Sequence, residues 1–183
     1  SRSIRTWSDG FVGALIDAHG ESDGQRLFHT QANAFGDRYC DTFGPEDAVV
    51  DLDELMTLAR SKDGFKIKAR VYRHSDDEHN AVRLKLYVLG GVLPLSASMP
   101  IFENLGLKVI GEDSYPVTLH TSDDWAGDGA VLDFLMERID EGPGDLSIVK
   151  EPLEEAFHAI VEGEAESDGF NRLVIGAGLS WRD

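Results

Sequence analysis

The chain has 183 residues, of which 42% are apolar, so it can form one ordinary domain with a hydrophobic core. Its formal net charge of −17 repels phosphate groups and anionic lipids, and we therefore expect neither nucleic-acid binding nor membrane binding. The sequence has no apolar run that could span a bilayer, no targeting segment and a single cysteine, which together indicate a cytoplasmic protein. Because the chain does not begin with Met, we expect it to be part of a longer protein.

Residues 1–62 are predicted to be helical. Apolar residues recur there at steps of three and four, as at Trp7 and Phe11. Pro45 suits the first position of a helix. Because Asp51 resembles a new helix start, we expect two short helices after Pro45 rather than one.

At Gly64 the spacing of apolar residues changes from helical to alternating. Residues 65–73 and 83–89 alternate apolar and polar side chains around a polar turn, which predicts a β-hairpin. One face of this hairpin collects cations and two tyrosines: Lys66, Lys68, Arg70, Tyr72, Arg83, Lys85 and Tyr87. This basic hairpin face could bind an anionic metabolite or dock on an acidic part of the same assembly. Aromatic side chains among cations are typical of an interface, so docking is favoured.

The hairpin is followed by a strand–loop–helix–strand unit. Gly90 and Gly91 break the strand, Ser96 is a candidate helix cap, and Gly106 suits a helix end. Short strands are predicted at 107–112 and 115–120. Residues 130–139 could form a strand or a helix; a strand is chosen because the sheet needs a partner there. Residues 152–162 form an amphipathic helix.

These elements predict an α+β fold. A ferredoxin-like antiparallel sheet has the spatial strand order fourth, first, third, second, with two helices on one face. The segments 83–89, 97–105, 107–112, 130–138 and 152–162 supply its first five elements, and 65–73 takes the place of the fourth strand. The result is a permuted ACT-like domain over residues 63–163. The helical segment 1–62 precedes it, and residues 164–183 begin a further helical segment.

Ligand-like clusters are few, and no catalytic residue and no metal site are assigned. The turn after the first hairpin strand offers imidazole and carboxylate groups that suit zinc or manganese: His74, Asp76, Asp77, Glu78 and His79. A solvated turn is the favoured interpretation, and a stand-alone metal-binding domain or enzyme using this turn is the alternative. Asp123, Asp124 and Asp128 lack the spacing of an EF-hand, and Cys40 lacks the surroundings of a nucleophile.

The glycine loop is the candidate effector site. Gly90 and Gly91 could bring backbone N–H groups up to a ligand carboxylate, although a plain turn is the favoured interpretation. The loop has neither a Walker nor a dinucleotide fingerprint. The candidate effector-binding residues are Gly90, Gly91, Ser96 and Asn104.

Two stretches resemble the large NAD-specific glutamate dehydrogenases of bacteria. The first is PLSASMPIFENLGLKVIGEDSYPV, from Pro94 to Val117, and the second combines DGFNRLV, from Asp168, with AGLSWR, from Ala177. The resemblance spans nearly the whole chain and is most specific in its last two-thirds.

The resemblance implies a regulatory or assembly role. The parent enzyme oxidatively deaminates glutamate to 2-oxoglutarate with NAD, in amino-acid catabolism. Its substrate lysine and dinucleotide fold lie in a later catalytic domain, so no catalytic residue and no cofactor are carried over to this chain. The implied partners are the other domains and subunits of a homo-oligomeric parent and a candidate amino-acid effector, acting through allosteric regulation.

Overall fold

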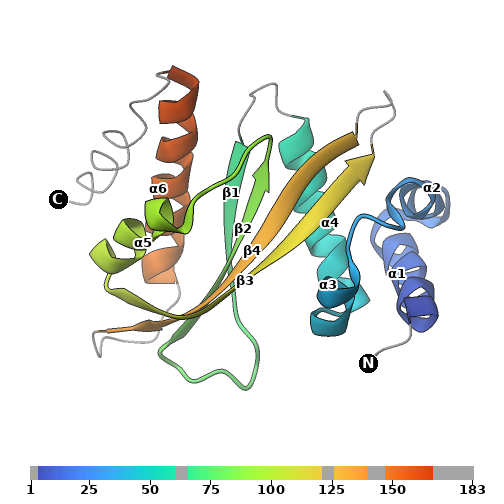
Figure 1. Cartoon of the computed structure of the whole chain (residues 1–183). Coiled ribbons are helices and arrows are strands. Elements are labelled where there is room, and N and C mark those ends of the chain that lie inside the picture. Colours follow the sequence, from blue (N-terminus) through green and yellow to red (C-terminus); the bar gives the residue numbers. More distant parts are fainter. Residues whose placement is uncertain (1–3, 61–65, 121–125, 140–146, 167–183) are drawn as a thin grey trace.

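The computed structural model describes residues 4–60, 66–120, 126–139 and 147–166 (Figure 1). Four helices come first, followed by strands with two further helices. The elements are α1 (Ile4–His19), α2 (Glu21–Gln31), α3 (Asp37–Thr42), α4 (Pro45–Ala59), β1 (Lys66–Tyr72), β2 (Ala81–Leu89), α5 (Leu95–Asn104), β3 (Leu107–His120), β4 (Ala126–Arg138) and α6 (Ser147–Glu166). The helical segment predicted over 164–183 lies outside these residues beyond Glu166.

The four strands form one antiparallel sheet in the order β1-β2-β4-β3. This is the predicted permuted ferredoxin-like order, and the pairing of β1 with β2 sets Ala69 opposite Leu86. The strand assignment for 130–139 is confirmed by β4. The two short strands predicted over 107–120 are instead one strand, β3, with a bulge between Val109 and Gly111. Because β3 is an edge strand, Pro116 fits within it despite lacking an N–H group.

Helices cover both faces of the sheet (Figure 1). On one face, α5 and α6 enclose the apolar side of the hairpin, where the ring of Phe102 lies 5.0 Å from that of Phe134 and 5.8 Å from that of Phe157. This confirms an α+β, ACT-like fold with its own two helices on one face. The N-terminal helices, predicted only as a flanking segment, pack on the opposite face.

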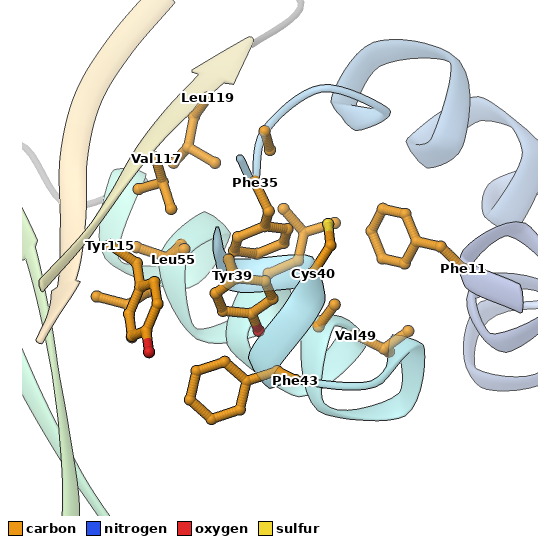
Figure 2. Packing of buried hydrophobic residues seen from close by; sticks show 14 of the residues in the cluster. Phe11, Phe35, Tyr39, Cys40, Phe43, Val49, Leu55, Tyr115, Val117 and Leu119 are labelled. Carbon is orange, nitrogen blue, oxygen red and sulfur yellow. The ribbon is translucent and has the colours of Figure 1, made fainter. Parts of the chain in front are cut away.

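An aromatic core joins these N-terminal helices to the sheet (Figure 2). The ring of Phe35 stacks on that of Tyr39 at 4.2 Å, and Phe43 meets Tyr115 of β3 edge-on at 5.5 Å. The chain just before α3 also extends the sheet edge, because Phe35 forms an isolated β-bridge with Val117. Burial of so much aromatic surface is the main force that holds the two parts together.

Helix α4 is one continuous helix that presents polar side chains to the sheet. It begins with Pro45 at a first-turn position, and Glu46 and Asp47 add favourable negative charge there. The prediction of two short helices in this region is wrong, because α4 continues through Asp51 to Ala59. Asp51 is therefore not a cap but an interior helical residue that faces the sheet.

Candidate functional site

The basic hairpin face is covered by α4 of the same chain. Lys68 Nζ lies 2.9 Å from Glu54 Oε1, and Lys66 Nζ donates to the Ala59 carbonyl oxygen at 3.3 Å. Lys85 is only 1% exposed and Tyr87 is fully buried. The sequence left open what would cover this face, and in the structure an acidic helix of the same chain does so.

A single buried carboxylate organises the centre of this contact. Asp51 accepts hydrogen bonds from Tyr39 Oη (2.5 Å) and Lys85 Nζ (2.7 Å) on Oδ2. On Oδ1 it accepts from Tyr87 Oη (2.6 Å) and from an Arg70 guanidinium nitrogen (3.2 Å). We call these five residues the Asp51 cluster. Four donors from α3 and two strands thus converge on one side chain of α4.

Charge and burial in the cluster are balanced by direct contacts. The Lys85 ammonium pairs with Asp51 and also lies 3.9 Å from the centre of the Phe43 ring, which favours a cation. Burial raises the pKa of Tyr39 and of Tyr87 above the ordinary value, and the neighbouring Asp51 carboxylate raises both further. Both phenols therefore remain protonated and keep donating to Asp51.

The other two members of the basic hairpin face have different partners. Tyr72 Oη donates to Asp133 Oδ1 at 2.5 Å, and burial raises the pKa of both groups. Arg83 Nε lies 2.9 and 3.0 Å from the two carboxylate oxygens of Asp77, and this hydrogen bonding lowers the pKa of Asp77. Every residue predicted for the face is thus engaged within the chain.

These contacts suit a structural joint better than a reaction centre. In the part of the chain that the structure describes, no buried side-chain nitrogen or oxygen lacks a hydrogen-bond partner. Asp51 and Tyr39 are site residues that the sequence pattern did not predict. A signal was present, because Asp51 lies on the apolar stripe of α4 with Ala48 and Leu55, where an unpaired carboxylate would be costly.

The acidic turn after β1 gives no support to a metal site. Asp77 is held by Arg83 and also accepts a hydrogen bond from the backbone N–H of His74 at 2.8 Å. Within residues 4–60, 66–120, 126–139 and 147–166, no group of three or more His, Cys, Asp or Glu side chains could hold a metal ion. Asp123 and Asp124 lie outside these ranges. Cys40 is buried beside the aromatic core.

The candidate effector residues lie at the two ends of α5. Gly90, in a left-handed conformation with φ of 79°, and Gly91 precede the helix, and Ser96 is exposed in its first turn. Pro94 occupies the N-cap position, so the prediction of Ser96 as the cap is wrong. Asn104 is the last helical residue, about 12 Å from Ser96 at 1.5 Å per residue. The structure thus groups Gly90, Gly91 and Ser96 and leaves Asn104 apart.

Gly91 borders an open pocket of about 390 Å³ between the start of α5 and the sheet. We call it the α5 pocket. Leu132 and Phe134 of β4 contribute to its apolar lining, and Glu112 and Asp128 are its acidic residues. Its volume falls within the range of small-molecule sites.

No helix in the described ranges is both long enough and apolar enough to cross a lipid bilayer. Residues 14–58 match the family described as "Glutamate dehydrogenase, helical motif 2", and residues 66–147 match "Glutamate dehydrogenase, ACT3 domain". The Asp51 cluster therefore joins side chains from both matched regions.

Curated relatives extend the match over the whole chain. The NAD-specific glutamate dehydrogenase of Halomonas elongata is 36% identical over 179 residues, which are 98% of this chain and 11% of that protein. The proteins of the same name from Pseudomonas aeruginosa and Mycobacterium tuberculosis are 32% and 28% identical, each over 100% of this chain. The chain spans 11% of the length of these relatives. It belongs to the family of NAD-specific glutamate dehydrogenases, of which it covers helical motif 2 and the ACT3 domain.

Proposed function

We propose that this chain is a non-catalytic regulatory or assembly module of an NAD-dependent glutamate dehydrogenase. The parent would convert L-glutamate, NAD and water to 2-oxoglutarate, ammonium and NADH, in the cytoplasm and as a homo-oligomer. The module would lie N-terminal to the catalytic domain and contact other domains and subunits there. The observation that carries the proposal is the Asp51 cluster, in which four donors on one buried carboxylate join helical motif 2 to the ACT3 sheet.

A regulatory or assembly module must couple a displacement of its helices to a displacement of its sheet. Helices that are held to a sheet by an aromatic core and by a buried charge move with that sheet as one body. A ligand or subunit that shifts either part would therefore shift the other. Hydride transfer, by contrast, needs a site that holds a nicotinamide against the substrate carbon. In the Asp51 cluster, Lys85 and Tyr87 instead use their polar groups to hydrogen-bond to Asp51.

The non-catalytic part of the proposal is tested by assaying the isolated chain for glutamate-dependent NADH formation at 340 nm. We expect no turnover, with the full-length parent as the positive control. Turnover by the isolated chain would refute the proposal.

The regulatory or assembly part is tested in the parent enzyme with this segment excised. We expect the excised parent to change its number of subunits, obtained from the light-scattering mass and the shortened subunit mass, or to lose a rate response to an amino acid that the intact parent shows. An excised parent with an unchanged number of subunits and an unchanged response to every amino acid would contradict the proposal.

A further inference from the structure

The α5 pocket begins where the helical cover of the sheet ends. Phe134 of β4 is covered by Phe102 of α5, with the two ring centres 5.0 Å apart. Side chains of a strand alternate between faces, so Leu132 and Ala130 follow Phe134 on the same face. These two residues are only partly buried and form the floor of the pocket. An apolar sheet surface is thus left open beside the start of α5.

The rim of the pocket is acidic. Glu112 lies on β3 directly opposite Phe134, and Asp128 lies on β4 one alternation beyond Ala130. Both carboxylates are exposed, and Asp128 Oδ1 accepts a long hydrogen bond of 3.5 Å from Thr118 Oγ1. No Lys, Arg or His side chain is among the described residues that line the pocket. An anionic ligand would therefore be repelled here, and a cation attracted.

From this combination we infer that the α5 pocket binds a small ligand that carries a cationic amine on an aliphatic body. The amine pairs with Glu112 at one end of the rim, and the aliphatic body covers Leu132 and Ala130 in the direction of Asp128. Val92, 86% exposed, and Leu95, 46% exposed, flank the same opening and lose contact with water when the ligand is seated. The inference rests on the proposed regulatory role and narrows its effector to amines, excluding acidic amino acids such as glutamate.

The inference is tested by calorimetry on the 183-residue chain at low ionic strength, with four probes that separate charge from shape. The probes are leucinamide, leucine, 4-methylpentanoate and glutamate. We expect saturable binding of leucinamide, weaker binding of leucine because its carboxylate meets the acidic rim, and no binding of the two net anions. Amide shifts in NMR spectra place the site, and they should be largest at Gly91, Gly129 and Ala130.

Matched substitutions connect the binding to the pocket. Glu112→Gln should weaken leucinamide binding about fivefold, the scale of one screened charge contact near the surface. Its control is Asp113→Asn on the same strand, whose carboxylate instead lies 3.4 Å from an Arg38 nitrogen and which should bind as the unsubstituted chain does. Ala130→Phe should fill the pocket and abolish binding, and a thermal unfolding curve checks whether this variant keeps its fold.

The inference would be overturned if leucinamide failed to bind, if glutamate or 4-methylpentanoate bound as tightly, or if Glu112→Gln and Asp113→Asn had equal effects. Should Ala130→Phe fail to fold, the comparison of Glu112→Gln with Asp113→Asn still tests the inference. None of these outcomes touches the assembly role, which the excision experiment tests separately.

Discussion

Replacement of Asp51 by Asn should be among the most destabilising single-atom changes available in this chain. The carboxylate accepts four hydrogen bonds, two on each oxygen. An amide retains one acceptor oxygen and points an NH₂ group at the other two donors. Two donors then lose their partner, at about 1–3 kcal/mol each. Lys85 is itself one of the four donors, so the cost of breaking its buried ion pair, about 3–5 kcal/mol, overlaps with the hydrogen-bond cost and is not added to it.

We therefore expect Asp51→Asn to lower the free energy of unfolding by about 4 kcal/mol, a large part of the about 5–15 kcal/mol typical of a domain. Guanidinium unfolding, followed by far-ultraviolet circular dichroism, measures the change as a lower midpoint at unchanged slope. Asp47→Asn is the matched control: it lies one turn earlier in α4, is exposed, and should cost less than about 1 kcal/mol.

A double-mutant cycle separates the ion pair from general damage to α4. Lys85→Met removes the buried ammonium, so Asp51→Asn should cost about 2 kcal/mol less in that background than alone. A cost below about 1 kcal/mol for Asp51→Asn, or additive effects in the cycle, would refute a stabilising ion pair between Asp51 and Lys85.

Three further outcomes follow from the same structure. Above pH 10 the unfolded chain loses phenolic protons that the folded chain keeps, so stability should fall by up to about 4 kcal/mol per pH unit for three groups. The phenolate absorbance of these three groups at 295 nm should appear only with unfolding, and their titration in the folded chain near pH 10 would contradict this. The phenols concerned are Tyr39, Tyr72 and Tyr87, whose pKa values are raised first of all by burial. Gly24→Ala should destabilise by about 1–3 kcal/mol, because the new Cβ would lie 2.6 Å from the Ile16 backbone. Gly13→Ala, with nothing within 4 Å, should instead raise the melting temperature slightly, and equal effects would contradict the packing argument. Raising NaCl from 50 mM to 1 M should increase the melting temperature because it screens the repulsion of a net charge of −17, and a decrease would show that salt-sensitive ion pairs dominate.

Periodicity was sufficient to predict most of the sheet. The alternation in 65–73 and 83–89 identified the hairpin and its two faces, and Ile67, Leu84 and Leu86 are buried on the apolar side as that alternation requires. The strand order followed from the rules that govern ferredoxin-like sheets rather than from any single residue. The motif from Pro94 to Val117 was sufficient to identify the family.

The candidate effector site was only partly predictable. A glycine pair between a strand and a helix indicated a loop where backbone could approach a ligand, and Gly91 does border the α5 pocket. The acidic rim depends on Glu112 and Asp128, which border the same pocket only because β3 and β4 pair in a particular register. A sequence pattern does not specify that register when a bulge shifts it, as between Val109 and Gly111.

By itself, the sequence determined which residues alternate, where the helices fall and to which family the chain belongs, because these depend on neighbours a few positions apart. Only the tertiary structure decided that the basic hairpin face is covered by α4. That contact joins Asp51 to Lys85 and Tyr87 across 34 and 36 positions of the chain. The physical reason is that a buried charge is stable only where several distant donors converge on it, and such convergence is a property of the assembled fold.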